Sequence, residues 1–158
     1  MKRNSAVRVV LSKKAYRQIR NGVTNARNDF EVGGVLVGYK MFKRYHVIAV
    51  TTSAKTAEKS KVSFTLDGDW HTARALELME AFRPKPSILG IWHSHICDGD
   101  TFSEQDRQSN MQLAISFNGV LSMIAMMTIP FQDLGITAYY ISPKGKESLC
   151  QIVIDDNT

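Results

Sequence analysis

The segment SILGIWHSHICDGDTFSEQDRQSNMQLAISF, residues 87–117, contains a predicted strand, a loop and a predicted helix in succession. Residues 87–95 have the apolar character of a strand that runs into histidines, and residues 96–102 are rich in aspartate and glycine. Ser103 is a typical helix-capping residue, so residues 103–117 are predicted to form a helix. This succession indicates a fold in which helices pack on a central sheet.

The regions on either side of this segment supply further strands and helices. Apolar residues recur at helical spacing in residues 69–83, and the prolines at 84 and 86 end this helix. Another helix is predicted to begin after Ser12 and to stop at Gly22, and the polar residues 53–61 are predicted to be a loop. Strands are predicted for residues 7–11, 33–40, 45–52, 62–66, 119–129, 135–142 and 148–155. The last three have the continuous apolar runs of strands covered on both faces. The predicted class is α/β or α+β.

Length and composition indicate one soluble domain that spans residues 1–158. Apolar residues make up 44% of the chain and charged residues 22%, so an ordinary hydrophobic core is expected. No apolar run is long enough to predict a membrane span or a secretory signal. The two cysteines, Cys97 and Cys150, do not make a disulfide framework. We therefore expect a cytoplasmic protein that does not enter a membrane.

The net charge of +5 is unevenly distributed along the chain. Residues 1–44 carry eleven Lys or Arg residues against only Asp29 and Glu31. Such a surplus is typical of a solvated basic face, and it also suits a docking surface for an acidic partner or nucleic acid. No nucleic-acid-binding motif accompanies the charge, so nucleic acid is not predicted as a partner.

Two histidines and an aspartate have the spacing of a metal site. Alternate side chains of a strand point the same way, so His93 and His95 project together. Asp106 lies in the first turn of the next helix, which a short loop can fold back over the strand end. Two imidazole nitrogens and one carboxylate leave the fourth position of a tetrahedral zinc ion open, as in catalytic sites. Zinc lowers the pKa of bound water to about 7, which supplies a nucleophile near neutral pH.

A second carboxylate is needed to carry the proton of the attacking water to the leaving group. Glu31 is the leading candidate for this general base because it begins the apolar run FEVGGVLVG, where a lone acid is costly without a task or a partner. A structural ion pair with a basic residue of the N-terminal region is the alternative interpretation. Ser103 and Asp106 are likewise explained by a helix capping box, which is compatible with a metal-binding role for Asp106.

These residues together resemble the signature of the JAMM, or JAB/MPN, family of zinc metalloproteases. Glu31 is followed by His93-Ser94-His95, then by seven residues, Ser103, two residues and Asp106. The resemblance extends from about residue 7 to residue 142. It implies a cytidine-deaminase-like fold with a curved central mixed sheet flanked by helices. It also implies that His93, His95 and Asp106 bind zinc, that Glu31 activates water and that Ser103 stabilises the oxyanion.

The resemblance further implies hydrolysis of the bond after the C-terminal glycine of a ubiquitin-like protein, in deconjugation or precursor processing. The chain is similar to compact prokaryotic members that accompany ubiquitin-like conjugation systems, including those of antiphage operons. The implied partners are a ubiquitin-like protein or its conjugate and the activating and conjugating enzymes of such a system. Many members have proline where this chain has Ile96 and Phe102, which predicts a less rigid loop.

Several alternatives are compatible with the same residues. The chain could be a peptidase of a sulfur-carrier protein, a metal-free scaffold of the MPN type, or a DNA-associated protein. Cys97 is either an ordinary loop residue or a thiolate that reaches the metal and inhibits the enzyme. His46 and His71 lack a partner pattern and are predicted to be structural.

Overall fold

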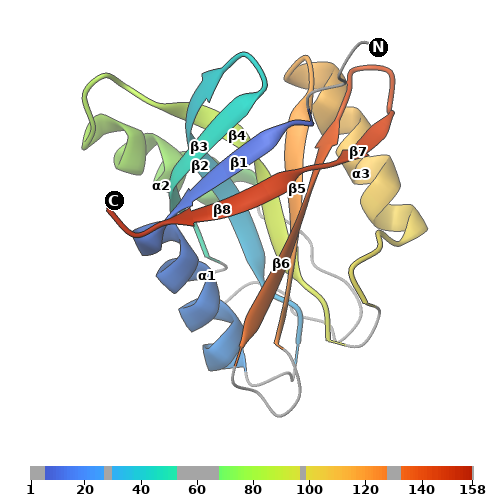
Figure 1. Cartoon of the computed structure of the whole chain (residues 1–158), viewed down its shortest axis with the longest axis horizontal. Helices are drawn as coiled ribbons and strands as arrows, with labels where there is room; N and C mark the ends of the chain where they lie inside the picture. The colour runs from blue at the N-terminus through green and yellow to red at the C-terminus, as the bar shows by residue number, and fades with distance from the viewer. Residues whose placement is uncertain (1–5, 27–29, 53–67, 97–98, 128–132, 158) are drawn as a thin grey trace.

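The computed structural model describes residues 6–26, 30–52, 68–96, 99–127 and 133–157. The predicted loop at 53–61, the predicted strand at 62–66 and Cys97 lie outside these ranges. The elements, drawn in Figure 1, are β1 (Arg8–Ser12), α1 (Lys13–Ala26), β2 (Gly33–Met41), β3 (Arg44–Val50), α2 (Gly68–Glu80), β4 (Ser87–Ser94), α3 (Glu104–Ser116), β5 (Val120–Met127), β6 (Leu134–Ile141), β7 (Glu147–Leu149) and β8 (Gln151–Asp155).

The eight strands form one mixed sheet in the order β7-β6-β5-β4-β2-β3-β1-β8. Strand β4 is central, because it pairs antiparallel with β2 and parallel with β5. The two edge strands, β7 and β8, are separated in the chain by Cys150 alone. The backbone N–H of Cys150 donates to Ala138 on β6, and that of Gln151 donates to Val7 next to β1. The sheet is therefore curved and nearly closed, with three helices around it (Figure 1), as the resemblance implied.

The prediction of a single, fully covered strand at residues 148–155 is wrong in both respects. The segment is divided at Cys150, because β7 pairs with β6 and β8 pairs with β1 at the other edge of the sheet. One straight strand cannot pair with both edges, so the chain must turn between them. Leu149, Val153 and Ile154 are exposed, so this segment is not covered on both faces.

Helix α1 begins as predicted and ends later than predicted. The side chain of Ser12 accepts a hydrogen bond from the backbone N–H of Ala15 at 3.0 Å, which is an N-cap. Gly22 does not end the helix, which continues to Ala26. A Cβ atom at Gly22 would lie 3.3 Å from both Trp92 and Thr52. This glycine allows the helix to pack closely on the sheet, and that role overrides its usual tendency to stop helices.

Helix α2 covers the opposite face of the sheet from α1. Ala75 and Met79 of α2 pack with Val35, Val37 and Ile88 of β2 and β4. The helix ends at Glu80 rather than at residue 83, and the guanidinium of Arg83 donates to the Glu80 carbonyl at 3.0 Å. Trp92 is fully buried on the α1 side, and its indole N–H donates to the Thr51 carbonyl at 2.9 Å.

Close packing between β2 and the end of β3 makes one glycine indispensable. A Cβ atom at Gly34 would lie 1.9 Å from the carbonyl oxygen of Thr51, which also holds the Trp92 indole. Gly34→Ala is therefore expected to lower the free energy of unfolding by about 3 kcal/mol, as overpacking does in a rigid core. At Gly135 the nearest atom would lie 3.7 Å away, so Gly135→Ala is the matched control, with a change of about 0.5 kcal/mol or less. Urea denaturation of both variants measures the difference, and equal losses would contradict the packing argument.

Candidate metal centre

The end of β4 brings two buried histidines together. His93 lies between Gly33 of β2 and Ile124 of β5 in the sheet register, and the N–H of His95 donates to Ala125 at 3.0 Å. Both side chains project to the same side, as the alternation of a strand requires. Their Nε2 atoms are 2.9 Å apart, and the two residues are 4% and 6% exposed.

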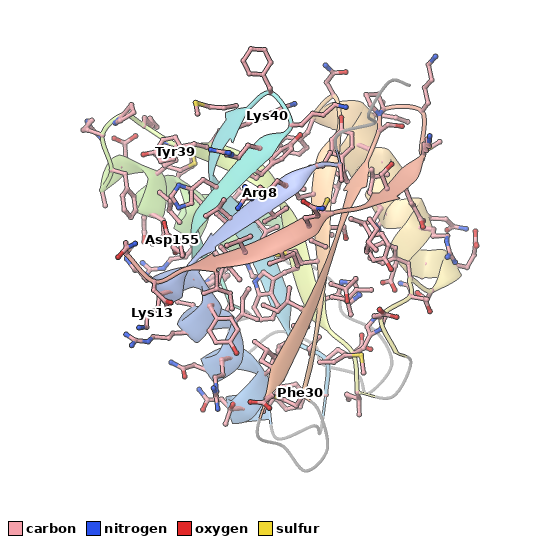
Figure 2. The ribbon with its side chains drawn as sticks, viewed as in Figure 1. Arg8, Lys13, Phe30, Tyr39, Lys40 and Asp155 are labelled. Atoms are coloured by element: carbon pink, nitrogen blue, oxygen red, sulfur yellow. The ribbon has the colours of Figure 1, made fainter. Side chains whose placement is uncertain are left out.

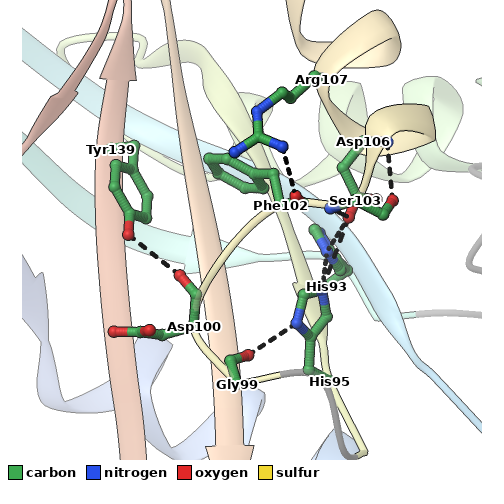
Figure 3. Close-up of polar contacts among 9 residues, drawn as sticks. All are labelled: His93, His95, Gly99, Asp100, Phe102, Ser103, Asp106, Arg107 and Tyr139. Carbon is green, nitrogen blue, oxygen red and sulfur yellow. Dashed lines mark hydrogen bonds and ion pairs between the residues drawn. The ribbon is translucent and has the colours of Figure 1, made fainter.

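A helix capping box carries the third polar group of the cluster. The N–H of Asp106 donates to Ser103 Oγ at 3.1 Å, and the N–H of Ser103 donates to Asp106 Oδ2 at 2.8 Å. The same Oδ2 lies 3.6 Å from Nε2 of His93 and 3.6 Å from Nε2 of His95, as Figure 3 shows. The capping interpretation and the metal-ligand interpretation are therefore both compatible with the geometry, because the cap orients the carboxylate toward the histidines.

The donor atoms of His93, His95 and Asp106 fit a small divalent metal ion. They all lie within 4.8 Å of one another. Zinc bonds of about 2.0–2.1 Å in tetrahedral geometry place ligand atoms roughly 3.3 Å apart. The observed separations of 2.9, 3.6 and 3.6 Å are close to that value. Among the described residues the group has three members, so a further position is left for water or substrate.

Hydrogen bonds between the histidines and Asp106 shift the pKa values of Asp106 and His95 toward the charged forms of these groups. Burial raises the pKa of Asp106, but hydrogen bonds to His93 and His95 outweigh burial and hold that pKa well below its usual range. Burial lowers the pKa of His95, but hydrogen bonds to Asp106 and to the Gly99 carbonyl, together with the charge of Glu31, leave it raised. Asp106 is therefore ionised at neutral pH. The local negative charge attracts a cation, whether that cation is a proton or a metal ion.

Glu31 lies beside the ligands without belonging to the ligand group. The N–H of Ser94 donates to the Val32 carbonyl at 2.7 Å, and the N–H of Val32 donates to Ser94 Oγ at 2.9 Å. Continuing this antiparallel register by one residue places Glu31 opposite His95, on the same side of the sheet. Glu31 is only 5% exposed, and its charge acts on the pKa of His95. A buried carboxylate is thus available next to the candidate metal position.

The carbonyl of Gly99 sets the tautomer of His95, which the sequence alone did not indicate. Nδ1 of His95 lies 2.8 Å from the Gly99 oxygen. A carbonyl only accepts hydrogen bonds, so Nδ1 must carry the proton. In the neutral ring Nε2 then carries the lone pair, directed toward His93 and Asp106, which is the arrangement that metal-binding histidines adopt.

Three side chains contact the described residues of the loop before α3, in which this chain has Ile96 and Phe102 where many family members have proline. Phe102 is buried, and its ring contacts the rings of His93 and Tyr139 at centroid distances of 6.3 and 4.9 Å. The hydroxyl of Tyr139 donates to the Asp100 carbonyl at 3.0 Å, and the guanidinium of Arg107 donates to the Phe102 carbonyl at 2.8 Å (Figure 3). Phe102 and these two hydrogen bonds therefore tie the described residues of the loop to β6 and α3.

Loss of these contacts is expected to weaken metal binding without unfolding the protein. Tyr139→Phe keeps the aromatic packing and removes one hydrogen bond, whereas Arg107→Ala removes the bond to Phe102 and the 3.2 Å ion pair with Glu147. Because outer contacts orient metal ligands, we expect zinc affinity to fall about tenfold in Arg107→Ala and less in Tyr139→Phe. Competition with a chromophoric chelator measures the affinities. Tyr16→Phe on α1 is the control, and an equal loss in that variant would show that the loop contacts do not orient the ligands.

The arrangement described above defines a curved mixed-sheet domain with a two-histidine, one-aspartate centre that can hold a metal ion. Residues 12–141 match the family of prokaryotic homologs of the JAB domain, so the chain belongs to that family. The solution structure of protein DSY2949 from Desulfitobacterium hafniense has a similar fold, with a TM-score of 0.72 at 20% sequence identity. That alignment covers 94% of this chain and 93% of the other. Comparison with curated proteins gives no significant match.

The helices that the structure describes are all too short or too polar to span a lipid bilayer.

Proposed function

We propose that this protein is a zinc-dependent peptidase or isopeptidase that hydrolyses the bond after the C-terminal glycine of a ubiquitin-like protein. The observation that carries the proposal is the buried cluster of His93, His95 and Asp106 with Glu31 opposite His95. Family membership supports a hydrolase of this kind. A zinc ion held by the three ligands would supply a Lewis acid that polarises a carbonyl and lowers the pKa of a bound water.

Glu31 is the group suited to move protons in this reaction. Its carboxylate lies on the side of the sheet toward which the ligands project and is buried, so few water molecules compete for it. In the proposed reaction, Glu31 accepts a proton from the attacking water and transfers it to the leaving amine. The Ser94 N–H donates to the Val32 carbonyl and the Val32 N–H donates to Ser94 Oγ, so the chain next to Glu31 is fixed against the end of β4.

Ser103 is suited to stabilise negative charge on the substrate oxygen. Its Oγ accepts the N–H of Asp106, so the hydroxyl proton remains available to a further acceptor. Ser103 is also the N-cap of α3, where the partial positive charge of a helix N-terminus favours an anion. Unlike the histidines, Ser103 is exposed, so substrate can reach it. We propose that its hydroxyl donates to the oxyanion of the tetrahedral intermediate.

The proposed partners follow from the proposed reaction. They are a ubiquitin-like protein or its conjugate, and the activating and conjugating enzymes that attach it. We propose that these proteins meet in the cytoplasm and that they belong to a bacterial ubiquitin-like conjugation system of the kind that antiphage operons encode.

Cleavage of defined fusions tests the proposal. A ubiquitin-like protein that ends in Gly-Gly is fused to a reporter, and a matched fusion ends in Val-Val. The zinc-loaded protein is expected to release the reporter only from the Gly-Gly fusion, to stop after chelation and to recover when zinc returns. Mass spectrometry of the products separates this activity from release of a single amino acid from a sulfur carrier. A protein that binds no metal and cleaves neither fusion would instead be a scaffold.

A further inference from the structure

A cavity lies at the opposite end of β4 from the metal centre. It has a volume of about 870 Å³, within the range of small-molecule sites. Ser87 lines this cavity, and His93 is six residues further along the same strand, β4. At about 3.3 Å per residue, the two positions are roughly 20 Å apart. The cavity is therefore separate from the site proposed for peptide hydrolysis.

The floor of the cavity is the outer face of β2, β3 and β1. Tyr39 of β2 lies opposite His46 of β3, which lies opposite Val10 of β1, so these side chains form one row across the sheet. Met41, Arg44 and Arg8 form the next row in the same register. Figure 2 labels Arg8 and Tyr39 on these strands. The turn after α2 supplies a wall, and the Tyr39 hydroxyl donates to the Pro84 carbonyl in that turn at 2.5 Å.

Positive charge is concentrated on this face at Arg44, which lines the cavity, and at Arg8, which lies next to Arg44 in the sheet. Arg8 and Arg44 are directly opposite each other, which is unfavourable for two like charges. Within the described part of the chain, neither forms an ion pair with a carboxylate. Asp155 is the one carboxylate among the described residues that line the cavity.

The remaining cations near the cavity contribute less. Arg83 and Lys85 line the wall, but both form ion pairs with Glu80, which offsets part of their charge. Lys40 also borders the cavity, but its ammonium group lies 5.4 Å from the ring centre of Tyr45, on the other face of the sheet. Arg44, together with its neighbour Arg8, therefore carries the argument for an anion.

His46 provides a second, independent indication of a ligand. It lines the cavity, and its buried Nε2 has no hydrogen-bond partner among the residues that the structure describes. Buried polar nitrogens are nearly always paired with protein, water or ligand. His46 lies on the same face of the sheet as Arg44 and Arg8, and an imidazole and two guanidinium groups are side chains suited to the oxygen atoms of a phosphate group.

We propose that this cavity binds a small ligand that carries a phosphate group. The phosphate pairs with Arg44 and Arg8 and contacts His46. The organic part of the ligand rests on Tyr39, whose ring is held by its bond to Pro84. This assignment also gives a role to part of the basic surplus of residues 1–44, which the metal centre does not use.

NMR titration of the ¹⁵N-labelled full chain tests the proposal. The probes are adenosine monophosphate (AMP), inorganic phosphate and a short single-stranded DNA oligonucleotide. Saturable shifts at Tyr39, Arg44 and His46 with AMP are expected, without matching shifts at the metal ligands. Tighter binding of AMP than of phosphate would identify a nucleotide-like ligand, and equal binding would identify free phosphate.

Two variants with the same change in charge distinguish a built site from general attraction. Arg44→Glu is expected to weaken AMP binding on the order of tenfold or more, because it replaces a charge-assisted contact with repulsion. Lys144→Glu, at an exposed position between β6 and β7, should leave the affinity unchanged. His46→Phe keeps an aromatic ring and removes Nε2, so it should also weaken binding. Thermal unfolding followed by circular dichroism confirms that each variant is folded.

Three results would overturn the proposal. They are the absence of saturable shifts with both AMP and phosphate, an equal loss of affinity in Lys144→Glu, and binding of the oligonucleotide alone. The last result would assign the surface to nucleic acid. The readout is binding and does not involve peptide hydrolysis, so it stands even if the protein proves not to be a peptidase.

Discussion

Replacement of Glu31 by glutamine is expected to reduce the rate of peptide hydrolysis by about 10²- to 10⁴-fold, the usual contribution of a general base. Glutamine has nearly the same size and keeps the hydrogen-bonding capacity of the side chain, but it cannot accept a proton. Glu31 is outside the ligand group formed by His93, His95 and Asp106. Zinc content should therefore stay near one ion per chain while activity is lost.

The measurement combines metal analysis, cleavage of the Gly-Gly fusion and thermal unfolding of wild type and Glu31→Gln. Glu104→Gln is the matched control, because Glu104 is an exposed carboxylate in the first turn of α3, close to Asp106 in sequence. The control should retain nearly full activity. Wild-type activity in Glu31→Gln would remove Glu31 as the base. A fall in the unfolding temperature large enough to account for the lost activity would instead indicate that Glu31 forms a structural ion pair.

Replacement of Asp106 by asparagine is expected to lower zinc affinity by at least about 100-fold and to abolish hydrolysis. Changes in the groups around a metal site usually cost 10- to 100-fold, and loss of a charged ligand should exceed that range. The amide oxygen of asparagine can still accept the Ser103 N–H, so the helix cap is kept. The substitution removes the negative charge of Asp106. In the wild type, hydrogen bonds to the two histidines lower the pKa of Asp106 and so keep this carboxylate ionised.

Chelator competition measures the zinc affinity, and the visible absorption of the cobalt-substituted protein reports on the number of ligands. Asp100→Asn is the matched control, because Asp100 is an exposed acid of the loop before α3 and contacts Thr137 instead of the histidines. We expect the control to keep its cobalt spectrum and its zinc affinity. Unchanged affinity in Asp106→Asn would mean that Asp106 serves only as a helix cap.

The parts of the site that the sequence predicted correctly are those with a local physical cause. His93 and His95 lie side by side because alternate residues of any strand share a face. Ser103 and Asp106 face each other because a capping box needs only one helical turn. The pairing of Glu31 with His95 is not local. The sequence pointed to Glu31 as a lone acid at the start of an apolar run and through the family signature, but strand periodicity does not predict which residue lies opposite His95.

The errors arose where a residue contacts a distant part of the chain. Gly22 has the chemistry of a helix stop, but the close contacts with Trp92 and Thr52 favour a glycine inside the helix. The apolar run around Cys150 has the pattern of one strand, but closure of the sheet divides it between two edges. Helix and strand propensities are weak preferences, so tertiary packing overrides them in such places.

The contacts of the loop before α3 also come from distant parts of the chain, which the local sequence does not indicate. The missing prolines predicted a less ordered loop, because only local stiffness can be read from residues 96–102. In the described part of this loop, Tyr139 and Arg107 donate hydrogen bonds to the carbonyls of Asp100 and Phe102, and Tyr139 lies on β6, more than thirty residues away in the chain. Nothing in the spacing of these residues indicates that they meet.

The sequence by itself determined the donor set of the candidate metal centre and the class of fold, because strand alternation, helix capping and apolar periodicity act over a few residues. Only the tertiary structure decided how the curved sheet nearly closes, which carbonyl sets the tautomer of His95 and where the basic residues gather beside His46. These features depend on strand order and register across the sheet. They arise from contacts between segments far apart in the chain, and the free energy of such contacts cannot be read from either segment alone.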